Sequence, residues 1–294
     1  MKKILSLVLA AGLCLSLFAA DIFTYAPIKG DVRAYKRTDF SIASRFGNYY
    51  RTPSVKFAHL LDENGNDIES TEISAKETLE NTIKSEYDYN GNLLSQVATD
   101  ADGETIWTTE ITYKNGLKAE MSEFNAAHEL RSKTIYTYSF NRLVDESSYD
   151  GNGALVWKII YTYDGDDRLD TVSDYFPTGS LSDQRKYEYD DNGIVKSITH
   201  TDSISKVALK DVIRYNNAGI VTEIATYDEA QQVTKRVVFK YDTNGNIAQV
   251  STYNVANKFG GIVNELVGMS DFSFKYASDP DLEVNDEVIV VSEK

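Results

Sequence analysis

The chain has 294 residues and a formal net charge of −15, from 30 basic and 45 acidic side chains. An acidic chain of this kind is a poor partner for nucleic acid and for anionic membrane surfaces. Cys14 is the single cysteine, which excludes a disulfide framework.

The first 20 residues are predicted to be a secretory signal peptide. Two lysines precede an apolar run over residues 4–17, and two alanines follow it. The run is shorter than the roughly 20 apolar residues of a membrane span, so we expect no transmembrane helix after cleavage. Lipidation of Cys14 is disfavoured, because it lies inside the apolar run and follows Leu13 instead of a small residue. The protein is therefore predicted to be exported to the periplasm, the cell surface or the medium.

Residues 21–56 form a basic segment that precedes an acidic remainder. The segment holds seven basic and three acidic side chains. Opposite charges attract, so we predict that residues 21–56 dock on the acidic body as an N-terminal cap.

Residues 57–294 are predicted to form a repeat domain. A tyrosine that ends an alternating run recurs at intervals of 26, 25, 25, 26, 26 and 26 residues. The next interval, to Tyr276, is 35 residues, and the excess is assigned to an insertion near residues 257–269. Each unit contains two turn segments about twelve residues apart, which predicts about eight β-hairpins and roughly sixteen strands. The tyrosines that mark the period are Tyr87, Tyr113, Tyr138, Tyr163, Tyr189, Tyr215 and Tyr241.

The motif "YDTNGNI", which starts at Tyr241, resembles a calcium loop at first sight. An EF-hand loop needs glycine at position 6 and a glutamate at position 12, whereas here the glycine is fourth and the twelfth residue is Tyr253. Asp or Asn followed three residues later by Gly is instead typical of a bulged hairpin turn. We therefore expect no metal and no cofactor. The turn glycines Gly91, Gly193, Gly219 and Gly245 are predicted to have positive φ.

The same motif supports a family resemblance. The matching sets are Tyr87, Asp88, Gly91 and Leu93; Tyr241, Asp242, Gly245 and Ile247; and, with one spacer fewer, Tyr189, Asp190, Gly193 and Ile194. Residues 57–276 thus resemble the YD repeats of Rhs and teneurin-type shell proteins. The resemblance implies tandem hairpins. It does not imply the family's hollow toxin shell, because the period is longer, the arginine that commonly follows the glycine is usually missing and the units are too few.

The repeats are predicted to form an all-β, curved or rolled meander sheet. Open sheets rarely exceed about ten strands without curling, and burial of the tyrosine face inside the curve would stabilise it. Residues 282–292 are expected to supply the closing strand. Alternate strands carry apolar residues and a tyrosine three apart, as in Ile247, Val250 and Tyr253, which requires either a bulge or two partly covered faces. An outer-membrane β-barrel is a further alternative, although short turns at both ends argue against it.

The functional prediction is an exported, non-enzymatic scaffold or binding module. Its tyrosines form either a stacked core or a platform for a glycan or an envelope protein. The histidines at 59, 128 and 200 are scattered, and Trp107 and Trp157 are expected to pack in the core. A hydrolase with a site in residues 21–56 or 257–273 remains the alternative. The candidate ligand-binding residues are Tyr138, Tyr163, Tyr189, Tyr215 and Tyr241.

Overall fold

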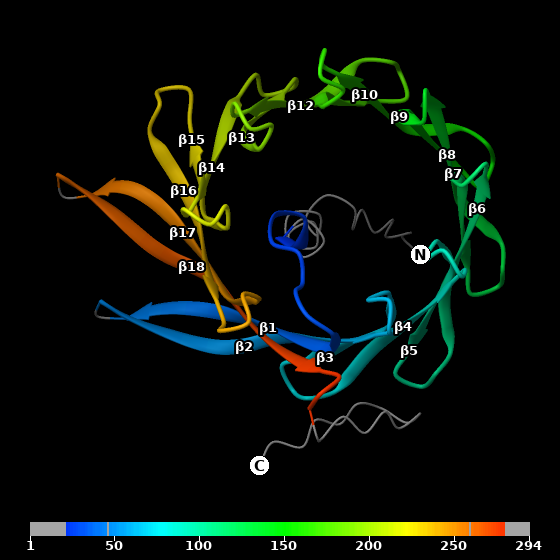
Figure 1. Cartoon of the computed structure of the whole chain (residues 1–294), viewed down its shortest axis with the longest axis horizontal. Coiled ribbons are helices and arrows are strands. Elements are labelled where there is room, and N and C mark those ends of the chain that lie inside the picture. The colour runs from blue at the N-terminus through cyan, green and yellow to red at the C-terminus, as the bar shows by residue number, and fades with distance from the viewer. Residues whose placement is uncertain (1–21, 46, 259, 280–294) are drawn as a thin grey trace, which may run out of the picture.

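A computed structural model describes residues 22–45, 47–258 and 260–279. The predicted signal peptide with Cys14, and the predicted closing strand 282–292, lie outside these residues. One antiparallel sheet of 18 strands makes up the fold, with each strand paired to its neighbours in chain order (Figure 1). The strands are β1 (Val32–Arg45), β2 (Asn48–Leu61), β3 (Asp67–Ser74), β4 (Leu79–Tyr87), β5 (Leu93–Asp100), β6 (Thr105–Lys114), β7 (Leu117–Asn125), β8 (Leu130–Ser139), β9 (Arg142–Asp150), β10 (Leu155–Tyr163), β11 (Leu169–Tyr175), β12 (Leu181–Tyr189), β13 (Val195–Asp202), β14 (Ala208–Tyr215), β15 (Val221–Tyr227), β16 (Val233–Tyr241), β17 (Ile247–Lys258) and β18 (Gly261–Tyr276).

The sheet is a closed barrel of 18 strands, so the predicted curved or rolled meander sheet of roughly sixteen strands is wrong. β1 pairs with β18 from Val32 opposite Tyr276 to Ser41 opposite Gly268. Within the predicted cap 21–56, residues 32–45 form β1 and residues 48–56 the first part of β2, so these residues belong to the sheet instead of covering it. These strands bring the two ends of the repeat together. Closure then pairs the edge N–H and C=O groups that an open sheet would leave exposed.

The hairpin turns have the geometry that the turn motif predicts. The φ angles of Gly91, Gly193, Gly219 and Gly245 are 80°, 78°, 73° and 83°. In the last of these turns the amide of Gly245 donates to the carbonyl of Asp242 at 3.2 Å. The Asp242 carboxylate oxygen Oδ1 accepts from the amides of Asn244 and Asn246 at 2.9 and 2.8 Å. The Asp242 carboxylate thus stabilises the turn by accepting hydrogen bonds from backbone amides within it.

A β-bulge resolves the spacing of three in the alternate strands. The β16–β17 register shifts just before Tyr241, so Ile247 lies opposite Tyr241 and Val250 opposite Phe239. Opposed residues point to the same side of a sheet, so all four side chains share one face. Tyr253 lies opposite Arg236 on the other face. The bulge turns the first two residues inward, and the tyrosine at the end of the triplet faces outward.

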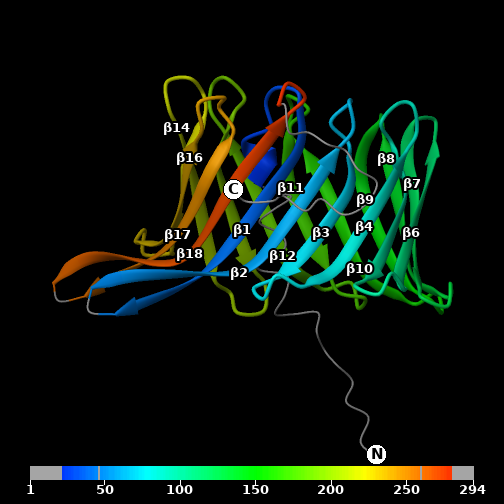
Figure 2. The same ribbon diagram turned by 90° about the horizontal axis from the view of Figure 1, so that it is seen from below.

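A short N-terminal helix lies inside the barrel. Residues 22–25 form one helical turn, and Figures 1 and 2 show this turn within the ring of strands, towards the rim where β1 begins. Ile22 is 6% exposed and packs into an apolar cluster with strand residues that include Phe239 and Phe272. Of the described residues, none forms a helix long and apolar enough to cross a membrane.

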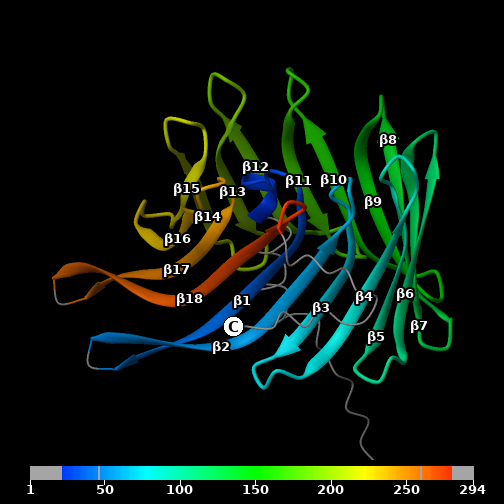
Figure 3. The same ribbon diagram turned by 60° about the horizontal axis from the view of Figure 1, so that its bottom comes forward.

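Two hairpins extend outward from the barrel wall near the opposite rim. Pairing between β1 and β18 ends at Ser41 and Gly268, whereas β1 with β2 and β17 with β18 continue to their tips. Figures 2 and 3 show these two hairpins flaring outward, away from the rim that holds the helix. The insertion near residues 257–269 forms part of one of them. We call residues 41–45, 47–54, 254–258 and 260–267 the projecting hairpins.

Candidate functional site

The side chains that line the inside of the barrel can be identified from their contacts with the N-terminal helix, which lies inside it. The ring of Phe23 makes edge contacts with Tyr35 and Phe272 at centroid distances of 5.4 and 6.0 Å, so these two side chains face inward. Successive strand residues alternate between faces, and opposed residues share one. The registers of all 18 strands then divide inner from outer side chains. A closed barrel of this strand number is too wide for its own side chains to fill.

One part of the inner wall is apolar; we call β13–β18 with β1 the apolar arc. Val221 and Ile247 are 1% exposed and Phe239 is 5% exposed. The described N-terminal residues pack here, and a polar contact fixes them. The Asn246 side chain is 2% exposed; it accepts from the Lys29 amide at 2.7 Å and donates to the Lys29 carbonyl at 3.0 Å. The inward side chains of the apolar arc are therefore used for packing with the N-terminal residues.

The other part is aromatic and charged; we call β6–β12 the polar arc. Inward-facing pairs of tyrosines recur on its strands at Tyr136 and Tyr138, at Tyr161 and Tyr163, and at Tyr187 and Tyr189. Charged side chains stand between them. The ammonium of Lys118 lies 4.5 Å from the Tyr136 ring centroid, and Tyr161 donates to the Glu146 carboxylate at 2.6 Å.

Burial changes the titration of these groups. It raises the pKa of the Tyr136 hydroxyl above its ordinary value, with a further rise from the charge of Glu146. Burial lowers the pKa of Lys118, an effect that Glu146 opposes. Burial also raises the pKa of Asp174, although the Arg185 guanidinium 3.4 Å away acts against it. The polar arc thus holds partly desolvated cations and anions beside aromatic rings, which suits the recognition of polar ligands.

The tyrosines that end the even-numbered strands form a belt at the helix-side rim. Most of their hydroxyls donate to the first carbonyl of the preceding strand, as Tyr189 does to Leu169 at 2.7 Å and Tyr241 to Val221 at 2.7 Å. Tyr163 and Tyr215 make the equivalent bonds at 2.8 Å to Leu143 and Val195. All five predicted tyrosines, Tyr138 included, are half-buried and point inward. The belt therefore ties neighbouring strands together while leaving part of each ring surface exposed.

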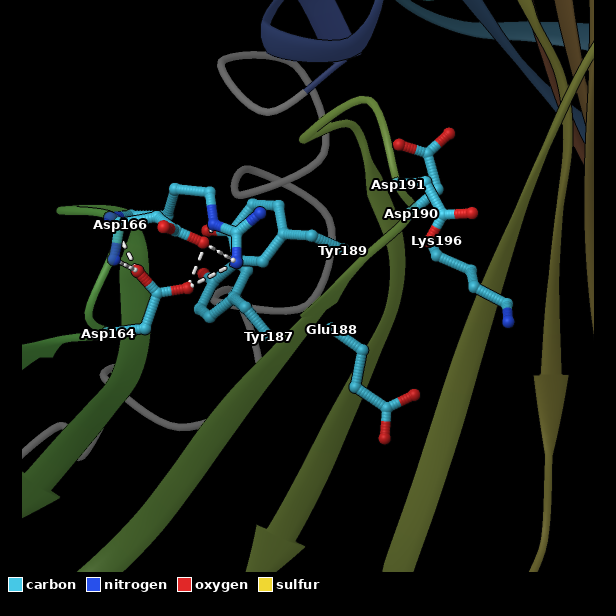
Figure 4. Close-up of a pocket in the computed structure, with 9 residues that line it drawn as sticks. Asp164, Asp166, Tyr187, Glu188, Tyr189, Asp190, Asp191 and Lys196 are labelled. Atoms are coloured by element: carbon cyan, nitrogen blue, oxygen red, sulfur yellow. Dashed lines mark hydrogen bonds and ion pairs between the residues drawn. The ribbon is translucent and has the colours of Figure 1, made fainter.

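A cavity of about 600 Å³ opens at this rim of the polar arc. Figure 4 shows its lining, with Tyr187 and Tyr189 on one side of β12 and Glu188 on the other. Arg168 lies over the Tyr189 ring, 4.7 Å from the centroid, and pairs with Asp164 at 2.8 Å and with Asp166 at 2.9 Å. Hydrogen bonds from the amide and side chain of Arg168 lower the pKa of Asp164. The cavity offers a preorganised cation on an aromatic face.

The remaining sequence candidates do not converge on one centre. His59 stacks on Tyr35 and contacts Asp67 at 2.6 Å, and His200 contacts Asp211 at 3.2 Å; these are separate places on the inner wall. His128 stacks on Phe124 in a turn. Trp107 and Trp157 face inward on the polar arc. Within the described ranges no group of three or more potential metal ligands is found.

The two segments predicted for a hydrolase site hold carboxylates that are engaged by arginines or a serine hydroxyl. Asp39 contacts Arg37 at 3.1 Å and accepts from Ser270 at 2.6 Å, and Asp271 contacts Arg51 at 2.8 Å. The more notable acidic pair lies elsewhere. Asp174 and Asp183 stand directly opposite each other on β11 and β12, facing inward. Sequence reasoning missed this pair, because only the strand register shows that residues nine apart share a face.

Comparisons with known proteins leave the family open. No family model and no curated protein matches the chain. Solved structures that show weak similarity include two porin-like proteins and a toxin pore. A porin-like protein from Bacteroides uniformis is 8% identical (83% of this chain, 98% of that chain, TM-score 0.47). A porin-like protein from Bacteroides vulgatus is 12% identical (83% and 99%, TM-score 0.35). The Photorhabdus luminescens Tc holotoxin pore is 10% identical (83% and 18%, TM-score 0.27), so this chain spans less than a fifth of it. At these scores the likenesses support no functional inference.

Proposed function

We propose that the protein is an exported, non-enzymatic binding protein that holds a glycan against the polar arc of its inner wall. Sugars present both C–H faces that stack on aromatic rings and hydroxyls that bind charged and amide groups. The polar arc offers both kinds of partner, repeated from one hairpin to the next. A repeated surface of this kind suits an elongated ligand made of similar units.

One observation carries the proposal: the inward-facing residue two positions before each belt tyrosine differs in type between the two arcs. Two residues before the belt tyrosine stand Tyr136, Tyr161 and Tyr187 on β8, β10 and β12 of the polar arc. The same position holds Ile111 on β6, where the polar arc begins, and Ile213 and Phe239 in the apolar arc. If packing were the only requirement, a hydroxyl at this position would add a desolvation cost without a gain. The hydroxyls and charges favour an inner surface that meets water and a polar ligand.

The outer wall supports contact with water as well. Ion pairs cover it from strand to strand: Lys84–Glu69, Lys133–Glu120, Lys158–Asp145, Lys210–Glu188, Arg214–Glu223 and Arg236–Glu223. A barrel that spans a lipid bilayer instead presents an apolar outer band, because charged side chains there are destabilising by several kcal/mol. The ion pairs therefore favour a binding barrel over the alternative of a membrane-spanning one.

A glycan array tests the proposal, with the protein purified after expression of the full-length chain. We expect wild type to retain one class of oligosaccharide and Tyr136→Ala to weaken its Kd at least about tenfold, a loss on the order of 1.4 kcal/mol. Tyr149→Ala is the matched control, since this half-buried tyrosine lies on the neighbouring strand and faces outward. Absence of any glycan ligand, or equal losses from both variants, would refute the proposal.

A second candidate function, hydrolysis of the bound glycan, is favoured by the Asp174–Asp183 pair. Directly opposed strand residues have Cβ atoms about 5 Å apart, which lets their carboxyl groups approach the separation of about 5 Å that retaining glycosidases use. The raised pKa of Asp174 suits a proton donor. Product release from the array ligand, lost in Asp183→Asn, would establish hydrolysis; unchanged ligand after prolonged incubation would exclude it.

A further inference from the structure

We propose that the projecting hairpins dock the protein on an anionic lipid surface. This inference is independent of the glycan proposal, because the hairpins extend sideways from the barrel, on the side of the rim opposite the N-terminal helix (Figure 2). The argument rests on their geometry, their exposed apolar side chains and their charge.

The two hairpins are held as one unit. The Tyr49 hydroxyl, on the β1–β2 hairpin, donates to the Asn264 carbonyl at 3.4 Å and accepts from the Leu266 amide at 3.3 Å. Arg51 adds an ion pair to Asp271 at 2.8 Å and stacks over Phe40, with 4.7 Å between guanidinium and ring centroid. These contacts therefore hold the two hairpins together, so both can meet one flat surface.

Both hairpins expose apolar side chains beside their tips. Tyr50 is 55% exposed on one hairpin, and Ile262 is 78% exposed on the other, followed by Val263 at 37%. Side chains at the end of a projecting hairpin form a convex edge, which matches a deformable lipid surface better than a protein groove. Tyrosine is also enriched at the level of lipid headgroups, where one end of its ring is apolar and the other wet.

Charge selects an anionic surface. The projecting hairpins hold Arg45, Arg51, Lys258 and Glu265, a net charge of +2 in a chain of −15. Lys258 pairs with Glu265 at 3.0 Å and Arg51 with Asp271, so Arg45 is the main cation available to headgroups. Each basic residue near an anionic bilayer gains attraction, while charges more than about 8 Å away are largely screened at physiological salt. The acidic barrel therefore does not prevent docking when the tips point to the membrane.

A second copy of this chain is another candidate partner for the basic hairpins, and it fits less well. Its outer-wall carboxylates are already paired, as Glu223 is to Arg214 at 2.8 Å and to Arg236 at 2.5 Å. Docking a basic tip there would compete with existing ion pairs. An anionic bilayer offers headgroups without that competition.

Vesicle co-sedimentation tests the proposal with the purified protein. We expect binding to phosphatidylglycerol vesicles, little binding to phosphatidylcholine vesicles, and release as salt rises. Tyr50→Ser combined with Ile262→Ser should lower binding about tenfold or more through lost apolar burial. Arg45→Gln should lower it several-fold for phosphatidylglycerol alone.

Tyr89→Ser is the matched control, because Tyr89 is 97% exposed at the other rim. It should leave vesicle binding unchanged, and all variants should keep the wild-type Tm because the changed side chains are exposed. Four results would overturn the proposal: no vesicle binding, equal binding to both lipids, an equal loss in the control, or a wild-type dimer that the tip variants dissociate.

Discussion

The apolar arc and the polar arc of the inner wall are built from the same repeat. They differ in the inward-facing side chains that precede the belt tyrosine along each strand. In the apolar arc Phe239 and Val237 are 5% and 3% exposed and join the cluster around Ile22. In the polar arc Tyr161 bonds Glu146, and Arg185 meets Asp174. One repeat can thus keep its turns and its belt while its inner positions change from packing to recognition.

The largest expected difference between the arcs is in stability. Phe239→Ala should lower the free energy of unfolding by about 3–5 kcal/mol, the range for deleting a buried aromatic ring. Tyr136→Ala should cost clearly less, because Tyr136 is only half-buried and no cavity is sealed when its ring is removed. Urea denaturation of both variants measures the difference. Equal losses would show that the polar arc is packed as tightly as the apolar arc.

The Asn246 contact should contribute the next largest effect. Asn246→Ala leaves the Lys29 amide and carbonyl without their partner, which should cost about 1–3 kcal/mol. The N-terminal residues should also become more sensitive to protease. Asn92→Ala is the control, since Asn92 holds the equivalent turn position but bonds only within its own turn, to Asp88. If both variants behave alike, the turn and not the N-terminal segment accounts for the loss.

Turn glycines test the scaffold that both arcs share. Gly219 has φ of 73°, and an added Cβ meets nothing within 4 Å, so Gly219→Ala isolates the conformational penalty. We expect a loss of about 1 kcal/mol. Gly165 also has open space around it but does not have positive φ, so Gly165→Ala should be near neutral. A thermal shift in the control as large as that in Gly219→Ala would remove the turn argument.

The belt predicts a gradual loss of stability in alkali. Burial raises the pKa of Tyr241 to about 12 and also raises the pKa values of Tyr189 and Tyr215. In the unfolded chain these hydroxyls titrate near 10, so between about pH 10 and pH 12 the folded chain holds more protons. Stability should therefore be unaffected below that window and fall as pH rises through it. Urea titrations across the window, followed by tyrosinate absorbance, check the slope; a flat profile would contradict the buried belt.

Local chemistry made part of this molecule predictable. The turns at Gly91 and Gly245 follow from an Asp and a Gly three residues apart, and the strand period follows from alternating side chains. Closure could not be predicted in the same way, because β1 and β18 pair residues more than 200 positions apart, such as Ser41 with Gly268. The basic charge of residues 21–56 suggested a cap, although the alternating side chains from Val32 onward build β1 and part of β2.

The candidate site was predictable only in part. The belt tyrosines were found from their period, but their bonds to carbonyls of the neighbouring strand depend on the closed sheet. Glu146 and Asp174 looked like any other acidic residues of an acidic chain. Their inward position follows from the register, and the register depends on bulges that shift each strand by one residue.

The most direct test of the central claim, that the polar arc is the binding surface, is ligand protection of a single thiol. In a Cys14→Ser background, Tyr136→Cys places the thiol on the inner wall and Tyr149→Cys places one on the outer wall of the adjacent strand. With the array-selected glycan present, maleimide labelling should slow at position 136 and stay unchanged at position 149. Unchanged labelling at 136, or protection at 149, would contradict the account.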